Sequence, residues 1–165
     1  MANPLIKKAV ITKKGFFRVR SEASLCGHFL HPQKGITTGN SKYGTHKVAV
    51  SIALDGKYDD DQIAFAAACE SFEYSGRSGY ASKGTKQIKD QIWNTDNNAL
   101  RESREQNFPI SVFVAEWDEN GKKLGYQLLP DNYYVWEIKD GNVDGVTLNP
   151  QTGHAQIKFV LKPGK

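Results

Sequence analysis

Residues 47–72 constrain the fold more than any other stretch, because an alternating apolar pattern passes there directly into a helical one. In KVAVSIAL, residues 47–54, every second side chain is apolar, as expected of a half-buried strand: Val48, Val50, Ile52 and Leu54. Three aspartates, residues 59–61, then stand where a helix N-terminus favours negative charge. Apolar residues recur behind them at helical spacing. The stretch predicts a buried strand followed by a helix that ends near Phe72.

Length and composition favour one domain over residues 1–165. A chain of 165 residues with 39% apolar content can build one hydrophobic core. The sequence shows no signal peptide and no apolar run long enough to span a bilayer, so we expect a cytoplasmic protein with no membrane partner, in the host cytoplasm if it is viral. Residues 1–8 are expected to form a flexible arm, and the glycine- and serine-rich residues 73–85 a flexible loop.

Positive charge is concentrated in the first third of the chain. Residues 1–50 contain nine Lys or Arg and one acid, whereas the remainder carries a net charge of −4, which together give +4. Such an asymmetry indicates a basic face that can meet a polyanion. Solvated lysines that protect edge strands from aggregation explain the same pattern equally well.

The region after residue 109 is typical of a β meander. Short β-prone runs alternate with turn sequences at intervals near ten residues: 110–117, 123–129, 133–138, 143–148 and 154–161. Further strands are expected over residues 16–20 and 25–30, a polar loop over 36–45, and short helices over 86–93 and 99–106. The fold class is therefore mainly β with one or two helices, as an OB-like five-stranded barrel with an inserted helix; the alternative is a β-sandwich.

The sequence offers no clear catalytic or metal centre. Cys26, His28 and His31 come closest to a metal cluster, but no second cysteine-histidine pair completes four ligands. A Gly-x-Ser-x-Gly elbow, a Walker loop and a dinucleotide fingerprint are all missing. We therefore expect no catalytic residue, no metal and no cofactor, and a binding protein in preference to an enzyme.

Interleaved basic and aromatic residues favour nucleic-acid binding. A single strand is bound by cations that follow its phosphates and by aromatic rings on which bases stack. Candidate phosphate contacts are Lys13, Lys14, Arg18, Arg20, Arg77 and Lys83, and candidate stacking rings are Phe16, Tyr74 and Tyr80. The alternative for the aromatic residues is a structural role, with Trp93, Trp117 and Trp136 as core anchors.

The order of these segments resembles the oligonucleotide-binding-fold single-stranded DNA-binding proteins of tailed phages. The shared features are a basic, aromatic first strand pair, KVAVSIAL, the helix DDDQIAFAAACESF, and returning strands with WDENGKKLG at a hairpin. The resemblance implies sequence-independent binding of single-stranded DNA or RNA in DNA replication. Such proteins usually end in an acidic tail, whereas this sequence ends in KFVLKPGK. A viral coat or assembly protein is the alternative function, and a homo-oligomer is open under both.

Overall fold

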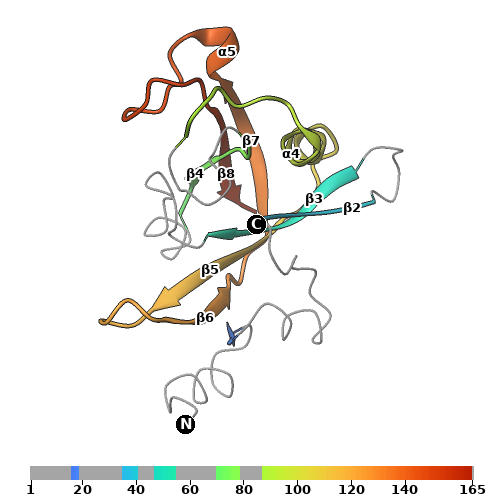
Figure 1. The fold of residues 1–165 in the computed structure, drawn as a ribbon. Helices are drawn as coiled ribbons and strands as arrows, with labels where there is room; N and C mark the ends of the chain where they lie inside the picture. The colour runs from blue at the N-terminus through green and yellow to red at the C-terminus, as the bar shows by residue number, and fades with distance from the viewer. Residues whose placement is uncertain (1–15, 19–34, 41–46, 55–69, 79–86, 165) are drawn as a thin grey trace.

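The structure, a computed structural model, describes residues 16–18, 35–40, 47–54, 70–78 and 87–164. Two β-sheets and two helices make up this part of the chain (Figure 1). The larger sheet has the strand order β1 (Phe16–Phe17), β6 (Lys123–Leu128), β5 (Ser111–Trp117), β3 (Lys47–Leu54) and β2 (Ile36–Asn40). The smaller sheet has the order β4 (Phe72–Ser75), β8 (Ile157–Pro163) and β7 (Tyr133–Asp140). The helices are α4 (Thr95–Glu105) and α5 (Gly141–Asp144).

Strands β3 and β5 pair in parallel, with Ser51 opposite Ser111 and Leu54 opposite Val114. The other strand pairs of both sheets are antiparallel. A parallel pair needs a long connection, and residues 55–110 supply it, with β4 and α4 inside. The connection therefore carries β4 into the second sheet and α4 against β3 and β7.

The main core lies between the two sheets and α4. Apolar residues of β3 and β5 pack there with the inward residues of the three-stranded sheet and with Leu100 of the helix. Phe72 and Tyr133 lie with their ring centroids 5.2 Å apart in this core. A smaller cluster holds residues of β1, β3, β5 and β6: Phe17, Ala53, Phe113, Ala115 and Tyr126.

Helix α4 is fixed at its start by a cap and along its length by a buried serine. Asn94 caps it by accepting a hydrogen bond from the Asn97 amide at 2.9 Å. Near the other end, the Ser103 hydroxyl accepts from the Ala49 amide at 2.8 Å and is 3.0 Å from the Ala49 carbonyl oxygen. Strand β5 pairs with β3 only over residues 51–54, so Ala49 lies before the first residue of that pairing. Ser103 supplies the hydrogen-bond partner that the Ala49 amide would otherwise lack on this side.

Several sequence predictions are confirmed. KVAVSIAL forms β3, and the predicted strands from residue 110 to 138 appear as β5, β6 and β7. The predicted hairpin turn is present between β5 and β6, where the Asp118 carboxylate accepts from the amides of Asn120 and Lys122. The strand expected over 154–161 appears as β8, beginning at Ile157.

Other predictions are wrong, each for a local reason. Residues 36–40 are not loop but β2, which pairs with β3. Residues 73–75 of the expected flexible loop belong to β4, and so does Phe72, the predicted helix end. Residues 87–93 are extended instead of helical, and α4 begins earlier than predicted, at Thr95. The strand expected over 143–148 is wrong because α5 and a turn occupy residues 141–147. The predicted arm, residues 1–8, and most of the predicted helix lie outside the described residues.

The mainly β class with two helices is confirmed, but the OB-like barrel is wrong. Over the described residues, the five strands form an open sheet whose edges are β1 and β2, and a second sheet packs against it. The same part of the chain holds no helix that is both long and apolar enough to cross a membrane.

We predict that Ser103→Ala lowers the free energy of unfolding by about 1–3 kcal/mol. The substitution leaves the buried Ala49 amide without its acceptor, and an unsatisfied buried donor costs about that much. Urea unfolding followed by tryptophan fluorescence measures the change. Glu105→Ala, at an exposed position of the same helix, is the control and should stay within about 0.5 kcal/mol of wild type. Equal stability of the two variants would contradict the role given to Ser103.

We also predict that Gly141→Ala destabilises the protein more than Gly145→Ala. A Cβ at Gly141 would collide with the Thr147 carbonyl oxygen, which is backbone and cannot rotate away. At Gly145, φ is +64° and a Cβ would meet nothing within 4 Å. Only the left-handed backbone conformation is penalised there, by about 1–2 kcal/mol. Thermal unfolding of the two variants side by side gives the order, and the reverse order would disprove this explanation.

Candidate nucleic-acid interface

The segment that follows β4 is the best-defined polar site of the described residues. Antiparallel pairing with β8 directs Tyr74 inward, opposite Phe159, and ends at Ser75, opposite Lys158. Residues 76–78 then leave the sheet. Gly76 donates its amide to the Ile157 carbonyl at 2.7 Å, which holds the first residue of this turn against β8.

Two buried amide side chains fix the turn from the other side. Asn97 accepts from the Arg77 amide at 2.7 Å and donates to the Arg77 carbonyl, also at 2.7 Å. Gln91 donates to the Gly76 carbonyl at 2.7 Å and accepts from the Ile157 amide at 2.8 Å. Both side chains are fully buried. Since buried polar groups are costly unless paired, this network holds residues 76–77 in one conformation.

Ser78 extends the fixed segment by one residue. Its φ is +85°, which is unusual for a residue with a side chain. The Ser78 hydroxyl accepts from the Ile92 amide at 3.0 Å. A sparsely populated backbone conformation persists only where its surroundings hold it, and such positions are frequent in binding sites.

Tyr74 and Arg77 meet at one end of this turn. The Arg77 guanidinium donates to the Tyr74 hydroxyl at 2.5 Å and lies 5.0 Å from the centre of the Tyr74 ring. Both groups pack against Gly35, just before β2: a Cβ there would lie 2.7 Å from Arg77 Nη2 and 2.8 Å from the Tyr74 hydroxyl. We call Gly35, Tyr74, Gly76, Arg77 and Asn97 the Tyr74–Arg77 cluster.

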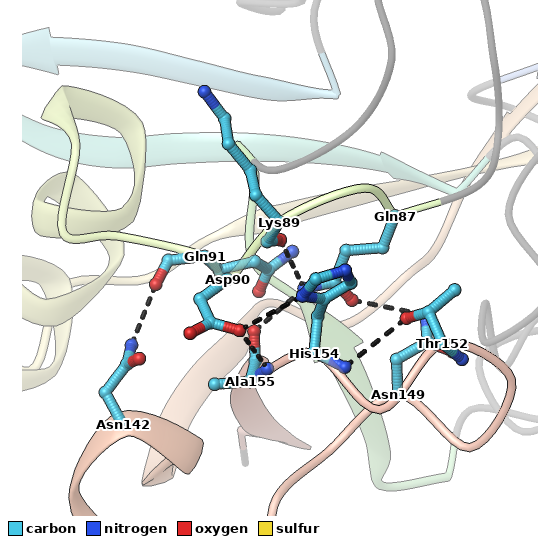
Figure 2. A network of polar contacts seen from close by, with 9 residues as sticks. All are labelled: Gln87, Lys89, Asp90, Gln91, Asn142, Asn149, Thr152, His154 and Ala155. Atoms are coloured by element: carbon cyan, nitrogen blue, oxygen red, sulfur yellow. Dashed lines mark hydrogen bonds and ion pairs between the residues drawn. The ribbon is translucent and has the colours of Figure 1, made fainter.

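A second network of hydrogen bonds holds residues 87–91 in place (Figure 2). The Asp90 carboxylate accepts from the Ala155 amide at 2.8 Å and lies 3.3 Å from His154 Nδ1. Gln87 donates to the Ala155 carbonyl at 2.8 Å, and Asn142 donates to the Gln91 carbonyl at 2.8 Å. The segment that carries Gln91 is thus tied to both α5 and the start of β8.

Two pKa perturbations lie outside the cluster. A hydrogen bond and charge attraction from Glu73 of β4, 2.7 Å away, raise the pKa of Lys139 on β7, the strand on the other side of β8. Hydrogen bonds from the amides of Thr147 and Val146, and from the Thr147 hydroxyl, lower the pKa of Asp144 in the turn after α5. Asp144 is exposed and Lys139 is partly exposed. We therefore attribute these pKa shifts to a local turn and a local ion pair, and not to a reactive site.

Two of the predicted stacking rings, Phe16 and Tyr74, are buried in this structure. Phe16 is 3% exposed and Tyr74 is fully buried, so neither ring offers a face on which a base could stack. Arg18 is exposed, and Arg77 is half-buried within the cluster. The remaining predicted contacts lie outside the described residues: Lys13, Lys14, Arg20, Tyr80 and Lys83.

The structure brings Tyr74 and Arg77 together but places Arg18 elsewhere. Arg18 follows β1, at one edge of the five-stranded sheet, whereas Gly35 precedes β2, at the opposite edge. Four strand spacings separate these edges, roughly 19 Å at about 4.8 Å each. Arg18 and the Tyr74–Arg77 cluster therefore cannot contact the same nucleotide.

The sequence interpretation missed Gln91, Asn97 and the two glycines of the cluster. The sequence prediction leaves Asn97 between two helices, 86–93 and 99–106. Asn94, three residues earlier, is the cap signal that starts α4. The available signal for the site was the Tyr-Ser-Gly-Arg sequence at the end of β4. Glycine there marks a close approach of other atoms.

The three tryptophans differ in burial, so their expected role as core anchors is only partly correct. Trp93 packs edge-on against Phe159 in the core and donates to Asp140 at 2.8 Å. Trp117 and Trp136 are 46% and 62% exposed. Each carries a lysine ammonium over its ring, Lys123 at 5.0 Å and Lys162 at 4.2 Å.

Within the described residues, no group of three or more His, Cys, Asp or Glu side chains is placed to hold a metal ion. Cys26, His28 and His31 lie in the part of the chain that the structure leaves undescribed.

Comparison with known proteins gives consistent matches. The SAD/SRA domain model matches residues 11–143. A histone-lysine N-methyltransferase of Arabidopsis thaliana, H3 lysine-9 specific SUVH4, is 33% identical over 103 residues, which are 58% of this chain and 16% of that protein. The match thus spans only a small part of that relative. It gives no ground for assigning methyltransferase activity to this chain.

Solved structures agree with the family match. KRYPTONITE in complex with mCHG DNA and SAH superposes with a TM-score of 0.71 at 26% identity, covering 91% of this chain and 31% of that one. The SUVH5 SRA complex with fully methylated CG DNA gives a TM-score of 0.62 at 25% identity, covering 88% and 84%. The SUVH5 SRA complex with methylated CHH DNA gives 0.62 at 26% identity with the same coverage.

These matches correct the predicted resemblance and the predicted partner. The phage single-stranded DNA-binding family is wrong, and so is a single-stranded DNA or RNA partner, since SRA domains bind methylated double-stranded DNA. A replication role and a viral origin lose their support with that resemblance. Two broader expectations are confirmed for the family. The SRA domain binds nucleic acid, and it is a DNA-binding domain and not a catalytic one. The SAD/SRA domain model matches more than half of the chain, and the chain therefore belongs to the SAD/SRA domain family.

Proposed function

We propose that this chain binds double-stranded DNA and distinguishes methylated from unmethylated cytosine. The observation that carries the proposal is the match to the SUVH5 SRA structures, which contain methylated DNA and which this chain covers almost from end to end. The binding domain itself is matched there, so the proposal does not depend on the other parts of the longer relatives.

Among the described residues, we assign recognition to the turn of residues 76–78, in which Arg77 and Ser78 are half-buried and Arg77 packs on the buried Tyr74. A methyl group is recognised by close apolar contact, and a base edge by donors and acceptors at fixed positions. In this turn the buried Tyr74 supports the Arg77 guanidinium, and Asn97 holds the Arg77 backbone by hydrogen bonds to its amide and its carbonyl. Groups held in this way lose little entropy on binding, which favours discrimination between similar ligands.

General affinity for the duplex would come from basic residues outside this cluster. Arg18 is exposed at the edge of the larger sheet, and we keep Lys13, Lys14, Arg20 and Lys83 as proposed phosphate contacts. Tyr80 remains a proposed base contact. Phosphate contacts fix the orientation of the duplex without reading its sequence, and they weaken as salt rises.

We predict that the protein binds a duplex with one methylated CG site about 10- to 200-fold more tightly than the unmethylated duplex. One methyl group in a fitted apolar site is worth that much discrimination. Fluorescence anisotropy with labelled duplexes at several salt concentrations measures both dissociation constants and the salt slope. A labelled single strand of the same sequence is included for comparison. Equal affinity for the two duplexes at every salt concentration would exclude the proposed function.

We further predict that Arg77→Lys lowers this discrimination, whereas Arg104→Lys does not. Both changes keep the charge. Lysine cannot reproduce the planar guanidinium that contacts the Tyr74 hydroxyl and ring. Arg104 is exposed on α4 and bonds the Trp136 carbonyl, which makes it a matched control. The ratio of the two dissociation constants is the readout, and the same ratio in both variants would remove Arg77 from the recognition site.

A further inference from the structure

We propose that Asn97 is the positioning residue of the DNA interface, since it sets the place of Arg77 through hydrogen bonds to the Arg77 backbone. This inference rests on the proposed function. Asn97 lies in the first turn of α4, twenty residues after Arg77, and it contacts the backbone of the recognition segment without forming its surface.

The hydrogen bonds of Asn97 use every polar atom of its side chain. Oδ1 accepts from the Arg77 amide at 2.7 Å, while Nδ2 donates to the Arg77 and Ile92 carbonyls, both at 2.7 Å. The side chain thus pairs with both backbone groups of Arg77, as a neighbouring strand would, and links that residue to the extended segment before α4. No other residue type matches this need: aspartate lacks the donor, serine is too short, and glutamine is one methylene too long.

Gly76 is the complementary half of this contact. A Cβ at Gly76 would lie 2.8 Å from Asn97 Oδ1 and 3.1 Å from its Cγ. Gly76 is not among the glycines with positive φ, so its backbone conformation is open to any residue. Glycine at this position makes room for the Asn97 amide, and adding a methyl group there would displace that amide from Arg77.

The contact transmits the position of a rigid helix to the recognition groups. Ser103 of the same helix is bonded to Ala49 in β3. Arg77, fixed by Asn97, in turn donates to the Tyr74 hydroxyl. Asn97 therefore connects the central sheet to the guanidinium and ring that lie against Gly35.

The test compares Asn97→Ser with Gly76→Ala, which disturb the same contact from opposite sides. For each variant we expect the methylated-to-unmethylated affinity ratio to fall by about tenfold, because two buried backbone groups lose their partners and Arg77 shifts. Binding to the unmethylated duplex should stay within about twofold, because phosphate contacts dominate it. Titration with excess DNA gives the fraction of active protein, so partial unfolding is not counted as lost affinity.

The double variant Asn97→Ser with Gly76→Ala supplies a second readout. If Gly76→Ala acts by displacing the Asn97 amide, the added methyl should have almost no further effect once that amide is gone. The two changes should therefore be strongly non-additive in the affinity ratio. Additive effects would overturn the pairing of Gly76 with Asn97.

Asn94→Ala is the matched control. It removes the cap of α4 and lowers the melting temperature, yet it leaves the Asn97 bonds to Arg77 in place. We expect its affinity ratio to equal that of wild type. If Asn97→Ser and Gly76→Ala keep the wild-type ratio, or if Asn94→Ala loses it equally, Asn97 is merely structural and the inference fails. A wild-type protein that does not distinguish the duplexes would instead remove the proposed function.

Discussion

The parallel pairing of β3 with β5 is the constraint on which the rest of the structure depends. Antiparallel neighbours can be joined by a tight turn, but a parallel pair requires the chain to cross from one end of the sheet to the other. Residues 55–110 make that crossing, and they contain β4, the Tyr74–Arg77 cluster and α4. The segment proposed to recognise DNA is therefore part of the connection that the sheet needs.

Polar contacts, as well as apolar burial, determine how this crossing packs. Gln91, Asn97, Ser103 and Gln156 are essentially inaccessible to solvent, yet they lie beside an apolar core. A buried amide tolerates few arrangements, because any other position leaves its donors or acceptors unpaired. Apolar side chains would allow small shifts of the turn at a modest cost. The polar network thus selects one conformation of residues 76–78, and the proposed discrimination of a single methyl group would depend on such a fixed conformation.

The sequence predicted the regular part of the fold and missed the part that forms the cluster. Alternation identified β3, and the Asp-Glu-Asn-Gly turn identified the β5–β6 hairpin, since both signals are local. Residues 143–148 have the composition of a strand, but α5 occupies residues 141–144, and Gly141 lies too close to the Thr147 backbone to accept a Cβ. Asn97 and Gln91 carry no periodic signal, because their roles depend on partners 15 to 66 residues away. Residues whose function is to join distant segments are therefore the hardest to recognise in a single sequence.

The sequence also predicted the wrong partner, single-stranded instead of double-stranded nucleic acid, because it does not show which distant residues meet. Basic and aromatic residues interleave both in proteins that stack single-stranded bases and in proteins that hold a duplex, so their order in the chain does not separate the two. Burial separates them. Phe16 and Tyr74, which were expected to stack on bases, are buried, and Trp117 and Trp136 each have a lysine ammonium over the ring. A single-strand binder needs a row of open rings, whereas this chain places its tyrosine and arginine in a supported cluster.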